Sequence, residues 1–153
     1  MRTSALGKPT EILVVEDNPA DIRLLQEVLK ELNMQTHLSL VHDGTEVLAF
    51  LRREEPYTQV AQPDLILLDL NLPGKTGLEV LAEVSAEPSL RRIPSVVLSS
   101  SQAAEDIVRS YELCANCYLV KPIDLVEFRR LVQTLHDFWL TAAELPSFRA
   151  RVA

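Results

Sequence analysis

The sequence predicts an α/β fold in which a doubly wound, five-stranded parallel sheet is combined with five helices. Two observations carry this prediction. Short aliphatic segments bounded by proline, glycine or polar residues recur along the chain, as strands buried on both faces of a sheet do. Amphipathic segments with capping residues alternate with them, and right-handed crossovers between parallel strands place such helices on both faces of the sheet.

The clearest strand is the aliphatic run 65–68, which lies between Pro63-Asp64 and Pro73-Gly74. Its four consecutive apolar residues lack the alternation of a half-exposed strand, so it is predicted to be central in the sheet. Residues 1–10 are mixed and polar and are predicted to form a flexible arm. The other strands are predicted at 12–15, 36–41, 94–100 and 117–120.

Four of the helical segments begin with a residue type that caps helices. The fifth, 102–115, has a weak cap and a broken apolar stripe, and is therefore predicted to be the most mobile helix. The capped helices start after Asn18, Asp43, Thr76 and Asp124, and are predicted to reach Asn33, Glu54, the residues before Pro88, and Trp139.

Composition and charge limit the class of protein. The 153 residues, 47% hydrophobic and 24% charged, suit one globular domain with little room for a second. A net charge of −7 argues against nucleic acid as a partner, because phosphate binding relies on clustered Lys and Arg. No apolar run approaches the roughly 18 residues of a membrane span, and the N-terminus lacks a signal-peptide core, so a cytoplasmic protein without a membrane partner is predicted.

Cys114 and Cys117 form a C-x-x-C pair. A zinc site would need further ligands, and the three histidines show no paired spacing. A thioredoxin-like pair opens a helix, whereas this pair closes a helix and enters a strand. Two small, buried, reduced cysteines are therefore predicted.

Polar residues of complementary kinds follow the predicted strands. The first strand ends in Glu16-Asp17, the third in Asp69, the fourth in a run of three serines and the fifth in Lys121. Counting five residues from Pro94 selects Ser99 as the hydroxyl at the end of the fourth strand, although three serines in a row leave the assignment ambiguous; Ser100 and Ser101 could be polar loop residues only. Because the carboxyl ends of parallel strands meet at one edge, the acids would converge there and repel unless a hard cation such as Mg²⁺ is bound. A site for a phosphoryl group is predicted from this combination, which offers cation ligands, an acceptor carboxylate, a hydroxyl and a countercharge. Taken alone, Asp69 could instead start a turn and Glu16 could lie in solvent.

On these motif positions, and over about residues 11–140, the chain resembles the response-regulator receiver domains of two-component signalling systems. The resemblance implies a flavodoxin-like sheet with strand order 2-1-3-4-5. It implies that Asp69 attacks the phosphohistidine of a partner histidine kinase and becomes an aspartyl phosphate. The Mg²⁺ ligands would be Asp17 and Asp69, with Glu16 bound directly or through water, and the backbone carbonyl of Asn71.

The resemblance also implies how the site responds to phosphorylation. Lys121 would pair with a phosphoryl oxygen, Ser99 would turn its hydroxyl toward the phosphoryl group, and Tyr118 would turn inward. An ordinary half-buried strand tyrosine is the alternative for Tyr118. The Lys121-Pro122 peptide is a candidate cis bond.

The chain is not predicted to be an enzyme beyond slow self-dephosphorylation, whose rate Asn71 and Ser101 would tune by position. Two other functions stay open. One is a pseudo-receiver that acts as an interaction module without phosphorylation. The other is a Mg²⁺-dependent phosphatase with an aspartyl nucleophile, which usually needs a second acid at the position that Asn71 occupies here.

The last predicted helix carries more apolar surface than one core face needs, which indicates a second partner. The segment 138–146 is similar to the C-terminal extension of small stand-alone receivers paired with cyanobacterial and bacterial phytochrome histidine kinases. The resemblance implies a light-sensing kinase as partner, and a homodimer formed by the fourth helix, fifth strand and fifth helix with the extension 141–153. The residues assigned to the dimer interface are Phe128, Leu131, Val132, Leu135, Phe138 and Trp139.

Overall fold

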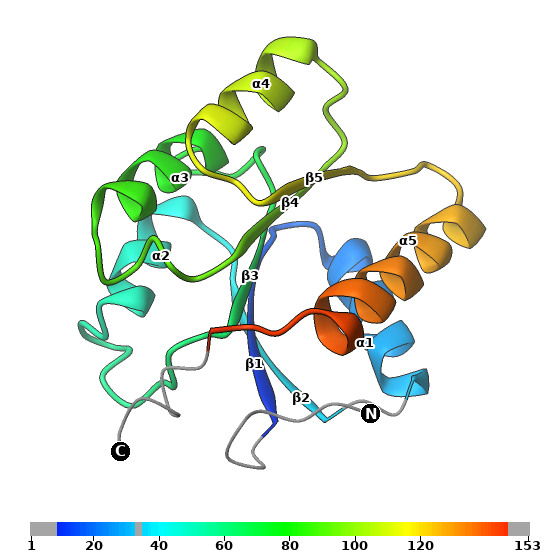
Figure 1. The fold of residues 1–153 in the computed structure, drawn as a ribbon, viewed down its shortest axis with the longest axis horizontal. Helices are drawn as coiled ribbons and strands as arrows, with labels where there is room; N and C mark the ends of the chain where they lie inside the picture. The colour runs from blue at the N-terminus through cyan, green and yellow to red at the C-terminus, as the bar shows by residue number, and fades with distance from the viewer. Residues whose placement is uncertain (1–8, 33–34, 147–153) are drawn as a thin grey trace.

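The computed structural model describes residues 9–32 and 35–146, and it confirms the predicted fold. Five parallel strands form one sheet in the order β2-β1-β3-β4-β5 (Figure 1). The strands are β1 (Thr10–Val15), β2 (Thr36–Val41), β3 (Leu65–Leu68), β4 (Ser95–Ser99) and β5 (Cys117–Val120). The α-helices are α1 (Pro19–Glu31), α2 (Gly44–Leu51), α3 (Gly77–Ala86), α4 (Ala104–Glu112) and α5 (Leu125–Asp137).

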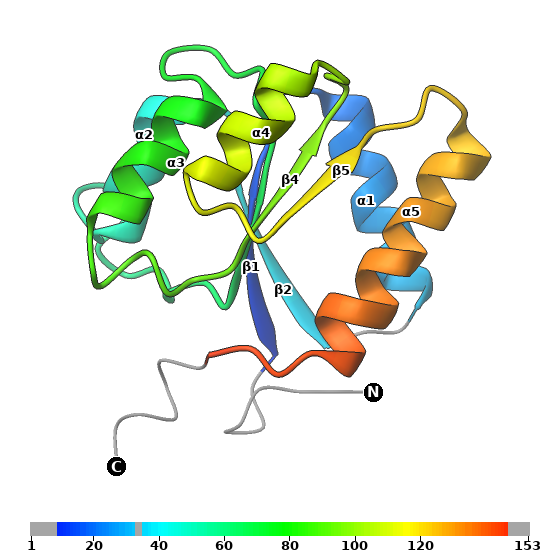
Figure 2. The same cartoon turned by 45° about the horizontal axis from the view of Figure 1, so that its top comes forward.

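The helices form one layer on each face of the sheet. Figures 1 and 2 show α1 and α5 on one face and α2, α3 and α4 on the other. Successive strand residues point to opposite faces, so Ile66 belongs to the core under α2 and α3, and Leu67 to the core under α1 and α5. All four residues of β3 are at most 2% exposed, as expected for the central strand. Within the described residues, no helix combines the length and apolarity needed to cross a membrane.

The predicted caps start the helices. The Asn18 side chain accepts from the backbone N–H groups of Ala20 and Asp21, and Thr76 forms a complete capping box with Glu79. Because α1 begins so soon after β1, its first turn lies beside the carboxyl ends of the strands. The N-terminus of α1 therefore borders the edge of the sheet where the polar residues at the strand ends meet.

Some element boundaries differ from the prediction. Thr10 is buried and pairs with Thr36, so position 10 belongs to the sheet rather than to an arm, while residues 1–8 lie outside the described residues. The second helix ends earlier than predicted, because Arg53 takes a left-handed conformation (φ 56°) that turns the chain. The predicted end of the first helix at Asn33 also lies outside the described residues.

The end of α4 explains where the two cysteines lie. The helix closes in a Schellman motif, in which the Ala115 N–H donates to the Ser110 carbonyl at 2.9 Å. This motif needs a left-handed residue just past the helix, and Cys114 takes that role with φ 72°. The prediction of two buried cysteines is therefore wrong: Cys114 is exposed, Cys117 is half-buried, and both are free thiols.

Two leucines of the C-terminal segment 138–146 pack into or against the core. Regular α-helix stops at Asp137, before the predicted end, and a π-helical turn, η1 (Phe138–Ala142), follows. Leu140 is only 2% exposed, and Leu145 packs against the core under α1 and α5. In Figure 1 this segment crosses the lower end of the sheet. The extension thus closes one end of the apolar core.

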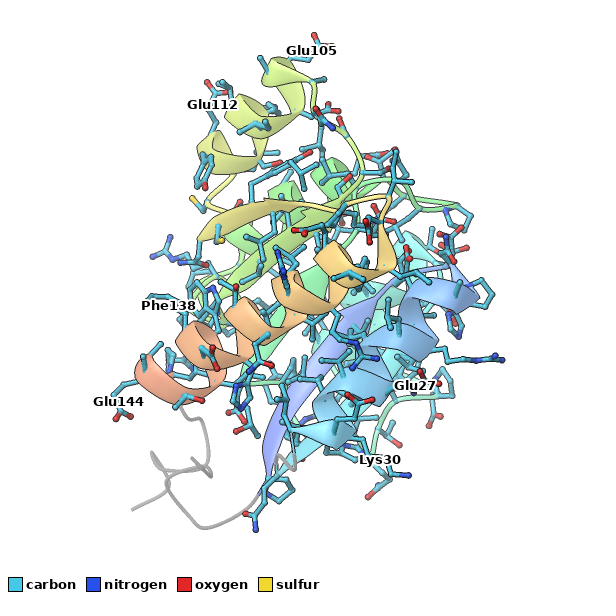
Figure 3. The ribbon with its side chains drawn as sticks, turned by 90° about the vertical axis from the view of Figure 1, so that its right-hand side faces the viewer. Glu27, Lys30, Glu105, Glu112, Phe138 and Glu144 are labelled. Atoms are coloured by element: carbon cyan, nitrogen blue, oxygen red, sulfur yellow. The ribbon has the colours of Figure 1, made fainter. Side chains whose placement is uncertain are left out.

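The wide apolar arc of α5 is accounted for within one chain. Phe128, Val132 and Leu135 are at most 3% exposed and pack in the core between α5, α1 and the sheet. Their assignment to a dimer interface is therefore corrected, because they leave no surface for a partner. The other residues of the predicted interface are Leu131 and Trp139, which are partly buried, and Phe138, which is 55% exposed at the end of α5 (Figure 3).

Candidate functional site

Two buried carboxylates lie side by side at the carboxyl edge of the sheet, here called the rim. β1 pairs with β3 so that Val15 lies opposite Leu68, and the Asp69 N–H donates to the Val15 carbonyl at 3.0 Å. Glu16 and Asp69 directly follow these paired residues, and both are buried, at 5% and 6% exposure. Carboxylates held so close and away from water repel each other unless positive charge compensates them.

Lys121 brings that positive charge from the end of β5. Its backbone N–H donates to the Ser99 carbonyl at 2.8 Å, which keeps the chain leaving β5 beside the end of β4. Its ammonium donates to Glu16, to Asp21 at 2.9 Å and to Asp69 at 3.1 Å. An ammonium has three N–H donors, so each of them finds one carboxylate.

Asp21 is a site residue that sequence reasoning missed. The sequence pattern accounts for it as an acid in the first turn of a helix, where carboxylates are favourable. The structure adds its contact with Lys121, which lies 100 residues further along the chain. The signal that could have revealed it is its position in the helical turn that follows the Glu16-Asp17 pair.

These five residues, Glu16, Asp17, Asp21, Asp69 and Lys121, are called the rim cluster below. When all are ionised, four negative charges face one positive charge, so three negative charges remain uncompensated. Burial raises the pKa of Glu16 to about 7, and its hydrogen bond with Asp69 acts in the same direction. Burial alone would lower the pKa of Lys121, but hydrogen bonds to Glu16 and Asp21 outweigh it and raise that pKa above its usual range. The lysine is therefore charged. The negative charge of the acids that it does not compensate favours the binding of a further cation.

The donor set fits a hard divalent cation such as Mg²⁺. Carboxylate oxygens of Glu16, Asp17 and Asp69 lie within 4.8 Å of one another. Both Glu16 oxygens already accept from protein groups, one from Lys121 and the other from the backbone N–H groups of Asp17 and Asn18. Asp17 is exposed, and its carboxylate makes no hydrogen bond or ion pair within the described residues. Asp17 is thus the acid best placed to bind such an ion directly, with water completing the coordination.

An open pocket lies over the rim cluster. Asp17, Asp21, Asp69 and Lys121 line it, and so does Asn71, whose N–H donates to Asp69 Oδ1 at 3.1 Å. The pocket therefore gives a ligand access to a carboxylate that is otherwise buried. The other lining residues are Asn18, Ser100, Pro122 and Ile123.

The predicted switch residues are joined through a loop rather than through the acids. Ser99 is fully buried, and its hydroxyl accepts from the Ser101 N–H at 3.3 Å. The Ser101 carbonyl accepts from the Tyr118 phenol at 2.8 Å, and the Ser101 hydroxyl donates to Asp106 in α4 at 2.5 Å. Within the described chain, no hydrogen bond links Ser99, Ser101 or Tyr118 to Asp69. Ser101 thus connects the rim strand β4 with α4 and β5.

The Lys121-Pro122 peptide is not cis. The cis bond found in the described residues precedes Pro56 instead. The trans form of an X-Pro bond is favoured by roughly 0.5–1 kcal/mol. The Lys121 ammonium reaches all three carboxylates with this trans peptide, so its orientation does not require the rarer isomer.

The fold and the rim cluster define a doubly wound α/β domain with a group of acids and a lysine gathered at the carboxyl ends of its parallel strands. The chain belongs to the response regulator receiver domain family, whose model matches residues 12–133. The resemblance inferred from the motif positions is therefore confirmed. Receiver domains are in general signalling proteins rather than enzymes, and in general they bind Mg²⁺.

Several similar proteins within this family are phytochrome response regulators or their relatives. Response regulator Rcp1 from Synechocystis sp. is 48% identical over 139 residues, which cover 91% of this chain and 95% of Rcp1. The crystal structure of the phosphorylated cyanobacterial phytochrome response regulator RcpA superposes with a TM-score of 0.88 at 49% identity, covering 91% of this chain and 99% of RcpA. The Mn²⁺-bound form of Rcp1 gives the same TM-score at 47% identity, covering 91% of this chain and all of that one. A divalent metal in that relative agrees with the acid cluster of this chain.

Proposed function

We propose that this chain accepts a phosphoryl group on Asp69 from a partner histidine kinase, in a Mg²⁺-dependent reaction, and passes the change on through protein contacts. One observation carries the proposal. The Asp69 carboxylate is buried at the end of the central strand and faces an open pocket; it accepts from the Lys121 ammonium at 3.1 Å and lies within 4.8 Å of carboxylate oxygens of Glu16 and Asp17. A carboxylate in this setting combines access for a phosphodonor with positive charge from the ammonium and a group of acids that would bind a cation beside it.

The transfer exchanges one bond to phosphorus for another. A carboxylate oxygen of Asp69 forms a bond to phosphorus while the N–P bond of the phosphohistidine breaks, and the histidine nitrogen keeps the electron pair of that bond. Lys121 lies 3.1 Å from Asp69, so its ammonium needs only a small movement to donate to a phosphoryl oxygen. When bound by Glu16, Asp17, Asp69 and the Asn71 carbonyl, Mg²⁺ supplies positive charge to the phosphoryl oxygens.

A phytochrome-type, light-sensing histidine kinase is the proposed donor. Support comes from RcpA, a cyanobacterial phytochrome response regulator that shares 49% of residues with this chain over almost its whole length. The test is a comparison of phosphotransfer rates from a purified phytochrome kinase and from an unrelated histidine kinase. A preference for the unrelated kinase would contradict this part of the proposal.

The proposed output is a protein contact made by the surface of α4, β5 and α5, including homodimer formation. Val108 and Tyr111 on α4 and Phe138 after α5 are at least half exposed. Of the residues predicted for the dimer interface, Phe138 and the partly buried Leu131 and Trp139 remain available. Phosphorylation would reach this surface through Ser99 and Tyr118, and slow self-dephosphorylation would be tuned by Asn71 and Ser101. Sedimentation at tens of micromolar, before and after phosphorylation, tests the dimer.

Phosphorylation itself is tested with a small donor. The protein is incubated with acetyl phosphate and Mg²⁺, and intact mass spectrometry is used to detect the addition of one phosphoryl group. The addition is expected in the wild type and in Asp137→Asn, which removes an exposed carboxylate, but not in Asp69→Asn or after chelation of the metal. A phosphoryl group that persists in Asp69→Asn would contradict the proposal.

A further inference from the structure

We infer that Asp21 is a positioning residue for Lys121. Its carboxylate holds the lysine ammonium at the rim while Asp69 changes its chemical state. The inference rests on the proposed function, because the change at Asp69 is its phosphorylation. It concerns a residue outside the motif positions that carry the family resemblance. The contacts, burial and local structure around Asp21 support it.

The first support is the number of bonds that the ammonium makes. The Lys121 side chain is only 9% exposed, so water cannot freely replace a missing partner. Its three donors are matched by Glu16, Asp21 and Asp69, and the bond to Asp21, at 2.9 Å, is shorter than the 3.1 Å bond to Asp69. Removal of any one carboxylate therefore leaves a buried donor without its partner.

The second support is the division of tasks among the three acids. Phosphorylation consumes the Asp69 carboxylate, so the ammonium has to move that hydrogen bond to a phosphoryl oxygen. Glu16 belongs to the group of carboxylates that can hold a cation, and both of its oxygens already have donors. Asp21 is not in that group. It is the partner of Lys121 whose state is changed neither by the phosphoryl group nor by the cation.

The third support is the rigidity of the helical turn that carries Asp21. Asp21 lies in the first turn of α1, and its N–H donates to the Asn18 side chain at 3.3 Å. Pro19 at the start of the helix fixes the backbone, and the partial positive charge of the helix N-terminus favours the ionised carboxylate. α1 packs on α5 and the sheet, so the ammonium is tied to a packed helix rather than to a loop.

Two substitutions of Asp21 test whether its carboxylate is needed for the phosphorylation rate. Asp21→Asn keeps the size of the side chain but removes its charge, so phosphorylation by acetyl phosphate should slow by about tenfold as the ammonium loses one charge-assisted bond. The Mg²⁺ affinity should change by less than about threefold, because Asp21 is outside the cation group. Asp21→Glu restores the carboxylate and should recover most of the rate.

The matched control is Glu27→Gln. Glu27 is an exposed acid further along α1 (Figure 3), so this variant removes the same charge from the same helix without touching Lys121. Its phosphorylation rate should equal that of the wild type. Thermal unfolding of every variant establishes that the compared proteins are folded.

A second readout does not depend on phosphorylation. A buried ammonium with three carboxylate partners exchanges its protons slowly with water, so ¹⁵N NMR of lysine ammonium groups should show a signal from Lys121 in the wild type. The signal should broaden or vanish in Asp21→Asn and persist in Asp21→Glu and Glu27→Gln. A Lys121→Arg variant assigns the signal by its loss.

The outcomes distinguish this inference from the proposed function. Loss of the ammonium signal together with slower phosphorylation in Asp21→Asn supports the positioning role. An unchanged ammonium signal overturns it, even if phosphorylation slows, because Asp21 would then act through charge alone. If the folded wild type accepts no phosphoryl group, the proposed function fails, and the ammonium signal still decides whether Asp21 holds Lys121.

Discussion

The Tyr118 phenol donates a hydrogen bond to the Ser101 carbonyl at 2.8 Å, which ties the edge strand β5 to the loop that follows β4. The N–H of the same serine donates to the Ser99 hydroxyl. One residue thus receives the bond from the edge strand and gives a bond to the hydroxyl at the rim. A movement of either side chain changes the bonding of Ser101.

Tyr118→Phe removes the bond to Ser101 and should lower the free energy of unfolding by about 1 kcal/mol. The loop should also open more often, so amide hydrogen exchange at 101–104 should speed up. Chemical denaturation and hydrogen exchange measure both effects. Tyr111→Phe is the control, because the Tyr111 hydroxyl accepts from the Tyr118 N–H at an exposed edge where water can replace it. A loss as large in Tyr111→Phe would show that the bond to Ser101 is not special.

Gly77→Ala should disturb the end of β3, where Asp69 lies. A Cβ at Gly77 would lie 2.6 Å from the Leu70 Cα and closer still to the Asp69 carbonyl oxygen. Alanine normally stabilises a helix relative to glycine by up to about 1 kcal/mol, but here the clash should reverse the sign and cost roughly 1–3 kcal/mol. Chemical denaturation measures the stability, and calorimetric titration should show weaker Mg²⁺ binding because Asp69 is displaced. A stabilised variant would contradict this account of the packing.

The raised pKa of Glu16 predicts a pH dependence of stability. Burial raises that pKa from its ordinary value of 4.5 to about 7, so the folded state binds this proton more tightly than the unfolded state. The resulting stability is fully present below pH 4.5 and is lost as the pH rises toward 7. Denaturation of the metal-free protein across this window should show the loss, and Glu16→Gln should lack it. Added Mg²⁺ should stabilise the wild type more at pH 8 than at pH 5, because the cation competes with the proton.

Cys114→Gly should stabilise the protein. Cys114 has φ 72°, in the left-handed region that costs a residue with a Cβ roughly 1–2 kcal/mol. Glycine avoids that cost but gains freedom in the unfolded chain, so a net gain of about 1 kcal/mol is expected. Thermal and chemical denaturation measure it. Cys114→Ala retains a Cβ and should gain nothing, so an equal gain in that variant would point to removal of the thiol instead.

The strands and the family motif could be predicted because each depends on neighbouring residues. The run 65–68 is aliphatic without alternation, and the structure buries all four of its residues. The strand-end residues Glu16, Asp69 and Lys121 follow such runs directly. Parallel pairing then brings them together, and their convergence required only the strand order.

The features that were missed depend on contacts between distant parts of the chain. Asp21 looks like any acid at a helix start until Lys121, 100 residues later, is placed beside it. The burial of Phe128 and Val132 depends on α1 and on the C-terminal turn η1. These two elements cover the apolar surface of α5 that is predicted from the sequence to form a dimer interface. The exposure of Cys114 depends on how α4 ends, and no glycine marks that position.

Trp139 is the one tryptophan of the sequence, and it packs against the same core cluster as Cys117 at the start of β5, close enough to affect the pKa of the thiol. Thiols quench indole emission at contact distance, so the chain has an optical reporter of its own edge strand. Fluorescence could then follow the arrival of a ligand or a second copy at this strand in real time, with no dye attached and no residue replaced.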